Sequence, residues 1–332
     1  MDDIHLIMDG IVKPGRKVLA TIIETEGSSY KKAGALMLFM ENGDRLGMIS
    51  GGCLEEDLVV RTYEVWENAK AITLQYDLRS ESDDGWGRGS GCNGIVTILL
   101  EPVDEQLAAD FAKMKKFLDD QIPVVLVKKI ESEIEYLFVP FEGEPFGWWQ
   151  GDIPFLVEPA EKSGMIPDTS IFQCLVKPKP RLIVFGAGQD SQPLVSLAVK
   201  TGFTVVVCDW REAFCSKKNF PDAHQLLIGF PRKLMGLLSF SHDDFVVIMT
   251  HDFQRDQLLL EWTLAENVKY IGVLGPKERT RRLLRQNEIP LSVHTPAGLS
   301  IGAVGAEEIA VSIVAQLITE CRSPLRTNIY IQ

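Results

Sequence analysis

Hydrophobic and polar positions follow one pattern in the first half of the chain and another in the second. In the first half, short β-branched and apolar runs alternate with turns, and an Asn-Gly-Asp turn predicts a hairpin between residues 36–40 and 45–49. Helical spacing of apolar residues predicts two helices, residues 54–68 and residues 104–118, the second capped by Asp104. Further strands are predicted at residues 17–24, 71–76, 95–100, 123–130 and 134–139. Together these elements indicate an α/β first domain.

From residue 181 onward, predicted strands and helices alternate strictly. The strands are expected at residues 182–185, 204–208, 245–249 and 270–274, and the helices at residues 192–200, 232–238, 254–266, 277–286 and 306–322. This alternation predicts a Rossmann-type fold, which is a doubly wound parallel sheet. Glycine and proline are frequent in residues 142–180, which end in Lys-Pro-Lys-Pro, so we expect a domain boundary there, between residues 1–178 and 179–332.

A glycine-rich turn follows the first strand of this second domain. Gly186 and Gly188 stand between four apolar residues and a helix, where main-chain N–H groups and the helix dipole favour a phosphate group. Asp209 ends the next strand, about 20 residues later, where dinucleotide-binding domains carry a ribose-binding acid. The alternative is a tight strand-to-helix turn with an acidic strand end. The spacing favours phosphate or ribose binding.

Two further residues are placed to meet an anionic ligand. Arg211 lies beside Asp209 and either contacts an anion near the ribose position or forms a surface ion pair. His251 follows the third strand of the second domain, at the carboxyl edge where doubly wound sheets bind ligands. It is expected either to bind a phosphate or to cap the next helix.

Two cysteines of the first domain lie in glycine-rich surroundings. Cys53 follows Ser50, Gly51 and Gly52 and precedes a predicted helix, whose dipole favours a thiolate that serves as nucleophile or soft-metal ligand. Cys92 ends an acidic, glycine-rich loop over residues 81–93. Each thiol also fits the more common role of a small buried apolar residue.

Composition narrows the classes of partner. The net charge is −12, from 34 Lys and Arg against 46 Asp and Glu, which argues against nucleic acid or an anionic membrane surface as a partner. The six cysteines form no CxxC pair, and the N-terminus lacks a basic segment leading into an apolar one. We therefore expect a soluble cytoplasmic protein.

Several strings together resemble the XdhC/CoxI family, the xanthine dehydrogenase accessory proteins. In the first domain the resemblance is carried by Gly27–Ala35, Ile49–Glu55 and Gly91–Gly94. In the second domain it is carried, in order, by Phe185–Gly188, Asp209–Arg211, Thr250–Asp252, Tyr270–Gly275, Pro296–Leu299 and Glu307–Ala310. The combination covers nearly the whole chain and is far more specific than the glycine turn alone.

The resemblance implies an accessory protein that binds molybdenum cofactor, supports its sulfuration by a cysteine desulfurase and delivers it to a xanthine dehydrogenase-type hydroxylase. It is expected to be a chaperone more than a catalyst, and a homodimer is plausible for a protein that must shield its cargo. By the same resemblance, Cys53 and Cys92 lie near the cofactor, and Ser50, Gly51 and Gly52 beside Cys53 are candidate cofactor-binding residues with them. Cys53 is also a candidate molybdenum ligand. In the second domain Gly186, Gly188 and Asp209 lie in a nucleotide-type pocket, with Arg211 and His251 as further cofactor-binding candidates. An NAD(P)-dependent oxidoreductase and a nucleotide-sensing module remain as alternatives.

Overall fold

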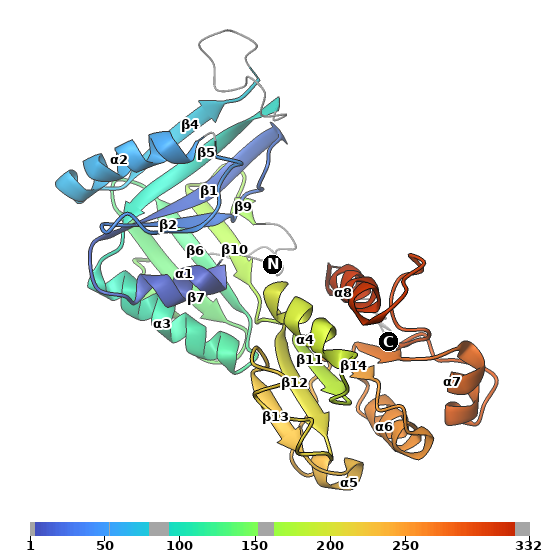
Figure 1. Cartoon of the computed structure of the whole chain (residues 1–332). Helices are drawn as coiled ribbons and strands as arrows, with labels where there is room; N and C mark the ends of the chain where they lie inside the picture. The colour runs from blue at the N-terminus through green and yellow to red at the C-terminus, as the bar shows by residue number, and fades with distance from the viewer. Residues whose placement is uncertain (1–3, 53, 80–92, 152–162, 323–332) are drawn as a thin grey trace, which may run out of the picture. The chain divides into compact units, whose positions relative to one another are not determined.

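The computed structural model describes residues 4–52, 54–79, 93–151 and 163–322. The chain divides into two compact units, Met1–Pro178 and Lys179–Gln332 (Figure 1). In the ranges that the structure describes, no helix has the length and apolar character needed to span a bilayer.

Unit 1 contains two antiparallel five-stranded sheets. The first has the order β3-β2-β1-β5-β4, formed by β1 (Lys17–Ser28), β2 (Leu36–Met40), β3 (Arg45–Gly47), β4 (Ile72–Asp77) and β5 (Asn93–Pro102). The second has the order β8-β7-β6-β10-β9, formed by β6 (Val124–Ile130), β7 (Ile134–Pro140), β8 (Phe146–Trp148), β9 (Gly164–Met165) and β10 (Ile171–Val176). The described part of unit 1 also has three helices, α1 (Ile4–Ile11), α2 (Glu55–Asn68) and α3 (Glu105–Asp119).

The alternation of side chains along β1 assigns the two faces of the first sheet. Leu19 and Ile23 join a core with α1, α3 and the second sheet, whereas Val18, Ala20 and Ile22 pack on the other face, which α2 covers. This arrangement buries both faces of β1 and holds the start of α2 against the sheet.

One buried ion pair joins the two sheets of unit 1. Lys128 of β6 and Glu101 of β5 are both fully buried and in direct contact. The Lys128 ammonium also donates to the Thr21 hydroxyl at 2.9 Å, and the Tyr136 hydroxyl donates to Glu101 at 2.8 Å. These bonds compensate part of the cost of burying the two charges.

Unit 2 is a six-stranded parallel sheet between two helical layers. Its order is β13-β12-β11-β14-β15-β16, formed by β11 (Arg181–Phe185), β12 (Thr204–Asp209), β13 (Gln225–Ile228), β14 (Phe245–Ile248), β15 (Tyr270–Val273) and β16 (Val293–His294). In Figure 1, α4 (Ser191–Lys200) and α8 (Ala306–Arg322) cover one face, and α6 (Phe253–Ala265) and α7 (Lys277–Leu284) the other, beside the short α5 (Pro231–Leu234). Strand order reverses between β11 and β14, the position at which such sheets bind ligands.

The predicted fold class, an α/β unit followed by a Rossmann-type sheet, is confirmed, and several local predictions need correction. Residues 142–180 contain three strands, including β10, which lies inside the second sheet beside β6. Helix α1 and the edge strands β13 and β16 were not predicted, and the helix expected at 232–238 is the single turn α5. Most of these elements are too short to show a hydrophobic periodicity, whereas α1 and β10 are long enough to show one and were missed nonetheless.

Candidate functional site

Two of the sequence strings in unit 1 meet where β1 ends and β5 begins. The pairing of these strands continues to their tips, with Gly27 opposite Gly94 and Ser28 opposite Asn93. Gly27 has a φ of +71°, and a Cβ there would lie 2.7 Å from the carbonyl oxygen of Asn93. A side chain at Gly27 is therefore excluded both by backbone conformation and by the close approach of β5.

The third string lies at the same place. A Cβ added to Gly51 would lie 4.0 Å from the Tyr30 ring, so the loop before α2 lies close to the loop after β1. Both Gly51 and Gly52 are exposed, and Tyr30 is also exposed. The structure thus brings together the loop of residues 27–32, the Ser-Gly-Gly turn and the start of β5. Cys53 and Cys92 lie outside the described residues.

Glu55, at the start of α2, fixes the Ser-Gly-Gly turn. Its buried carboxylate accepts hydrogen bonds from the N–H groups of Ile49 at 3.3 Å, Ser50 at 2.6 Å and Gly52 at 3.1 Å, and from the Ser50 hydroxyl. The Ser50 oxygen in turn accepts the N–H of Leu54 at 3.1 Å. Burial alone would raise the pKa of Glu55, but the hydrogen bonds from Ser50 and the main chain outweigh it and lower the pKa.

Sequence reasoning did not single out Glu55 as a site residue. The sequence did contain a signal for Glu55, because an acidic residue in the first turn of a helix is favoured by the free N–H groups there. What the pattern does not show is that the carboxylate turns back onto the preceding loop. Glu55 therefore positions Ser50, Gly51 and Gly52, three residues predicted to bind the cofactor.

In unit 2, the glycine turn after β11 lies against β14 and β12. Gly186 has a φ of +120°, and a Cβ there would overlap the carbonyl oxygen of Met249. The N–H of Ala187, between the two glycines, donates to the Asp209 carboxylate at 2.7 Å. The turn is thus anchored by the end of β12.

Asp209 accepts four hydrogen bonds from the protein itself. One oxygen accepts the Arg211 N–H at 2.8 Å and its Nε at 3.0 Å, and the other accepts Arg211 Nη2 at 2.8 Å and the Ala187 N–H. Burial alone would raise the pKa of Asp209, but the bonds from Arg211 and Ala187 lower it below its usual value. Of the two alternatives for Arg211, the ion pair with Asp209 is present, although the Asp209 side chain is buried, and cofactor binding by either residue stays a prediction.

His251 bridges the two sides of the switch point. Its Nε2 lies 2.7 Å from a carboxylate oxygen of Asp190, the residue before α4, and its side chain is 63% exposed. His251 has a φ of +59°, an uncommon conformation for a residue other than glycine. It does not cap α6, because Asp252 does so by accepting the N–H of Arg255.

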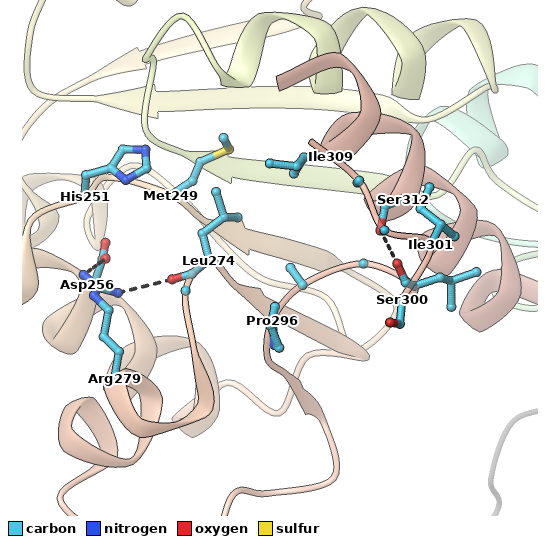
Figure 2. A pocket seen from close by; sticks show the side chains of 16 residues that line it. Met249, His251, Asp256, Leu274, Arg279, Pro296, Ser300, Ile301, Ile309 and Ser312 are labelled. Atoms are coloured by element: carbon cyan, nitrogen blue, oxygen red, sulfur yellow. Dashed lines mark hydrogen bonds and ion pairs between the residues drawn. The ribbon is translucent and has the colours of Figure 1, made fainter. Parts of the chain in front are cut away.

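A cavity of about 590 Å³ lies at the carboxyl ends of β14 and β15. Figure 2 shows Met249, Leu274 and Ile309 lining it, with Arg279 and Asp256 at one side. Asp256 is buried and accepts bonds from Arg279 at 2.7 Å and from Thr250. Among these lining residues, sequence reasoning named only His251 as a site residue. Leu274, Gly275, Pro296–Leu299 and Ile309 lie in strings that carried the resemblance but received no role, and Arg279 was not singled out.

Metal-binding groups do not cluster in the ranges that the structure describes, where no three His, Cys, Asp or Glu side chains are placed to share an ion. Cys174, Cys208 and Cys215 are buried, and burial raises the pKa of Cys215 to about 11. Burial also raises the pKa of Cys208, so Cys208 and Cys215 are protonated, and all three cysteines pack as small core residues. The prediction of Cys53 as a metal ligand lies outside the described residues.

Three family descriptions match the chain. The XdhC and CoxI family matches residues 13–77, the BH1974-like central domain matches residues 105–172, and the XdhC Rossmann domain matches residues 182–317. The first match covers β1 to β4 and α2, the second covers α3 and β6 to β9 and ends at the start of β10, and the third covers the parallel sheet of unit 2.

Similar proteins match over most of the chain. A protein of Bacillus subtilis (strain 168) described as a probable xanthine dehydrogenase subunit is 41% identical over 96% of this chain and 97% of its own length. "Molybdenum cofactor insertion chaperone PaoD" of Escherichia coli (strain K12) is 22% identical over 90% of this chain and 82% of its own. A crystal structure described as a xanthine dehydrogenase from Bacillus halodurans superposes with a TM-score of 0.89 at 44% identity, covering 99% of this chain and 98% of that one.

Proposed function

Because the chain belongs to the XdhC and CoxI family, we propose that it is an accessory protein that binds molybdenum cofactor and delivers it to a xanthine dehydrogenase-type hydroxylase. Family membership confirms the resemblance seen in the sequence strings. The observation that carries the proposal is the convergence of the three strings of unit 1 at one end of its first sheet. Their convergence is what a binding site requires, and a similar protein is named as an insertion chaperone for this cofactor.

The proposed site in unit 1 combines exposed main chain with sulfur. Gly51 and Gly52 leave main-chain groups accessible, and Glu55 and Ser50 hold this turn in one conformation. Cys53 and Cys92 belong to the same strings, and a thiolate is a ligand that suits a soft metal centre. We propose that these residues hold the molybdenum end of the cargo, with Cys53 as the ligand.

Purification from molybdenum-replete cells tests binding directly. The wild-type protein is expected to carry pterin, measured as its fluorescent oxidation products, together with molybdenum in near-equal amount. Cys53→Ala should lose most of both, whereas Cys321→Ala, on α8 of unit 2, should retain them. Wild-type protein that carries neither pterin nor molybdenum would contradict the proposal.

Delivery and sulfuration need a second assay. Loaded protein is mixed with the cofactor-free hydroxylase, with and without a cysteine desulfurase, and both hydroxylase activity and cyanide-releasable sulfur are measured. We expect activity to depend on the loaded protein and sulfur to depend on the desulfurase. Light scattering of the loaded protein tests the proposed homodimer.

A further inference from the structure

Five side chains of unit 2 form a ladder in which aromatic rings alternate with guanidinium groups. The Arg211 guanidinium lies 4.5 Å from the ring centre of Phe214 and 4.6 Å from that of Trp210. The Arg255 guanidinium lies 4.0 Å from the Trp210 ring and 5.6 Å from the Phe230 ring. The Trp210 and Phe230 rings are also stacked on each other, with centres 6.5 Å apart and an interplanar angle of 18°.

The ladder spans the carboxyl edge beside β12. Trp210, Arg211 and Phe214 follow β12, Phe230 follows β13, and Arg255 lies in the first turn of α6, so side chains from three segments meet at this edge. Each guanidinium is also held by a carboxylate, Arg211 by Asp209 and Arg255 by Asp252. Cation–π contact and ion pairing thus hold the same groups in place.

In dinucleotide-binding domains the acid at the end of the second strand binds the ribose, and here that acid is Asp209, which pairs with Arg211 of the ladder. A carboxylate offers about four acceptor positions, and the four hydrogen bonds to Asp209 use them all. A ribose hydroxyl would have to displace Arg211, and a base lying between these segments would have to displace Arg255 from Trp210. The β12 side of the crevice is therefore closed by the protein's own side chains.

The cavity on the β14 and β15 side of the switch point combines apolar walls with side chains that can bind an anion. Met249, Leu274 and Ile309 give it apolar walls that suit a planar ring (Figure 2). His251 and Arg279 lie on its lining, and the hydrogen bonds to Asp256 and to the Leu274 carbonyl engage two of the five Arg279 donors. Its volume of about 590 Å³ falls within the usual range for small-molecule sites.

We infer that unit 2 binds a phosphorylated heterocycle in the cavity beyond β14 and β15, while the ladder of Phe214, Arg211, Trp210, Arg255 and Phe230 excludes NAD(P)-type dinucleotides. The identification of this heterocycle as a pterin rests on the proposed function. The ring lies between the apolar walls, and the phosphate faces His251 and Arg279.

Titration with neopterin monophosphate, a fluorescent phosphorylated pterin, tests the cavity in the full chain. Ile309→Trp fills part of the cavity from α8, and Val311→Trp, on the same helix but outside the lining and 50% exposed, is the matched control. We expect saturable binding by the wild type and the control, and affinity weaker by about tenfold or more in Ile309→Trp. Ser300→Trp, on the exposed loop that lines the cavity, should act similarly without disturbing the core.

Two results would overturn the cavity assignment: no saturable binding by the wild type, or equal affinity in the wild type and both cavity variants. The proposed function fails separately, if protein that binds neopterin monophosphate in the cavity purifies without molybdenum cofactor. A titration with NADH tests the ladder. We expect no saturable binding at millimolar NADH, and saturable binding that Arg211→Ala weakens would show that the β12 side is open.

Discussion

Replacing Glu55 by glutamine tests the contacts that fix the Ser-Gly-Gly turn of unit 1. One carboxylate oxygen accepts the N–H groups of Ile49 and Ser50, and the other accepts the N–H of Gly52 and the Ser50 hydroxyl. Glutamine retains one carbonyl oxygen, so two of these four contacts are lost. Its amide group would then face two hydrogen-bond donors.

The expected destabilisation follows from these contacts. A hydrogen bond to a charged group contributes about 1.5–3 kcal/mol, and rotation of the Ser50 hydroxyl recovers part of the loss, so we expect about 3 kcal/mol. For a unit of this size, that lowers the melting temperature by about 6–12 °C. Glu56→Gln is the matched control, because the neighbouring Glu56 is 77% exposed and pairs with Arg45 at the surface. The melting temperature of Glu56→Gln should be close to that of the wild type.

The effect should also depend on pH in a defined direction. The pKa of Glu55 in the folded protein lies below its ordinary value of 4.5. Its stabilisation is therefore complete above the unfolded-state pKa and is lost as the pH falls through the folded pKa. Calorimetric melts at neutral and acidic pH should show the gap between wild type and Glu55→Gln closing in acid. Equal melting of wild type and Glu55→Gln at neutral pH, or an equal loss in Glu56→Gln, would refute the reasoning.

Three further changes test other parts of the fold. Lys128→Met should cost about 3–5 kcal/mol in urea denaturation because it leaves Glu101 buried and uncompensated, and adding Glu101→Leu should recover most of the loss. Asp104→Ala removes the side-chain cap of α3 and should lower the free energy of unfolding by about 1 kcal/mol in the same measurement. An unchanged free energy of unfolding would contradict the cap. Gly186→Ala should lower stability by about 3 kcal/mol through strain and overlap with a carbonyl group. Gly15→Ala, with positive φ but open space, should cost only about 1 kcal/mol, and equal losses would contradict the overlap.

The local sequence pattern was sufficient to predict a helix or strand where that element is long or has a clear boundary. The strands at the centre of unit 2 are continuous apolar runs because both of their faces are buried, and such runs are visible without any partner. The helix α3 was predicted at its start because Asp104 is a capping residue. In contrast, β10 was missed because the glycine and proline around it suggested a domain boundary, although Ile171–Val176 pairs along its whole length with β6.

The sequence by itself determined the family, the fold class and the strings in which the candidate site residues occur. Only the tertiary structure decided what those residues contact. Asp209 ends its strand as predicted, but its four acceptor positions are filled by Arg211 and by an N–H 22 residues away. Glu55 is an acidic residue in a first helical turn, and packing directs it onto the preceding loop. The reason is physical: periodicity and capping depend on near neighbours in the chain, whereas hydrogen-bond partners depend on which segments the fold brings together.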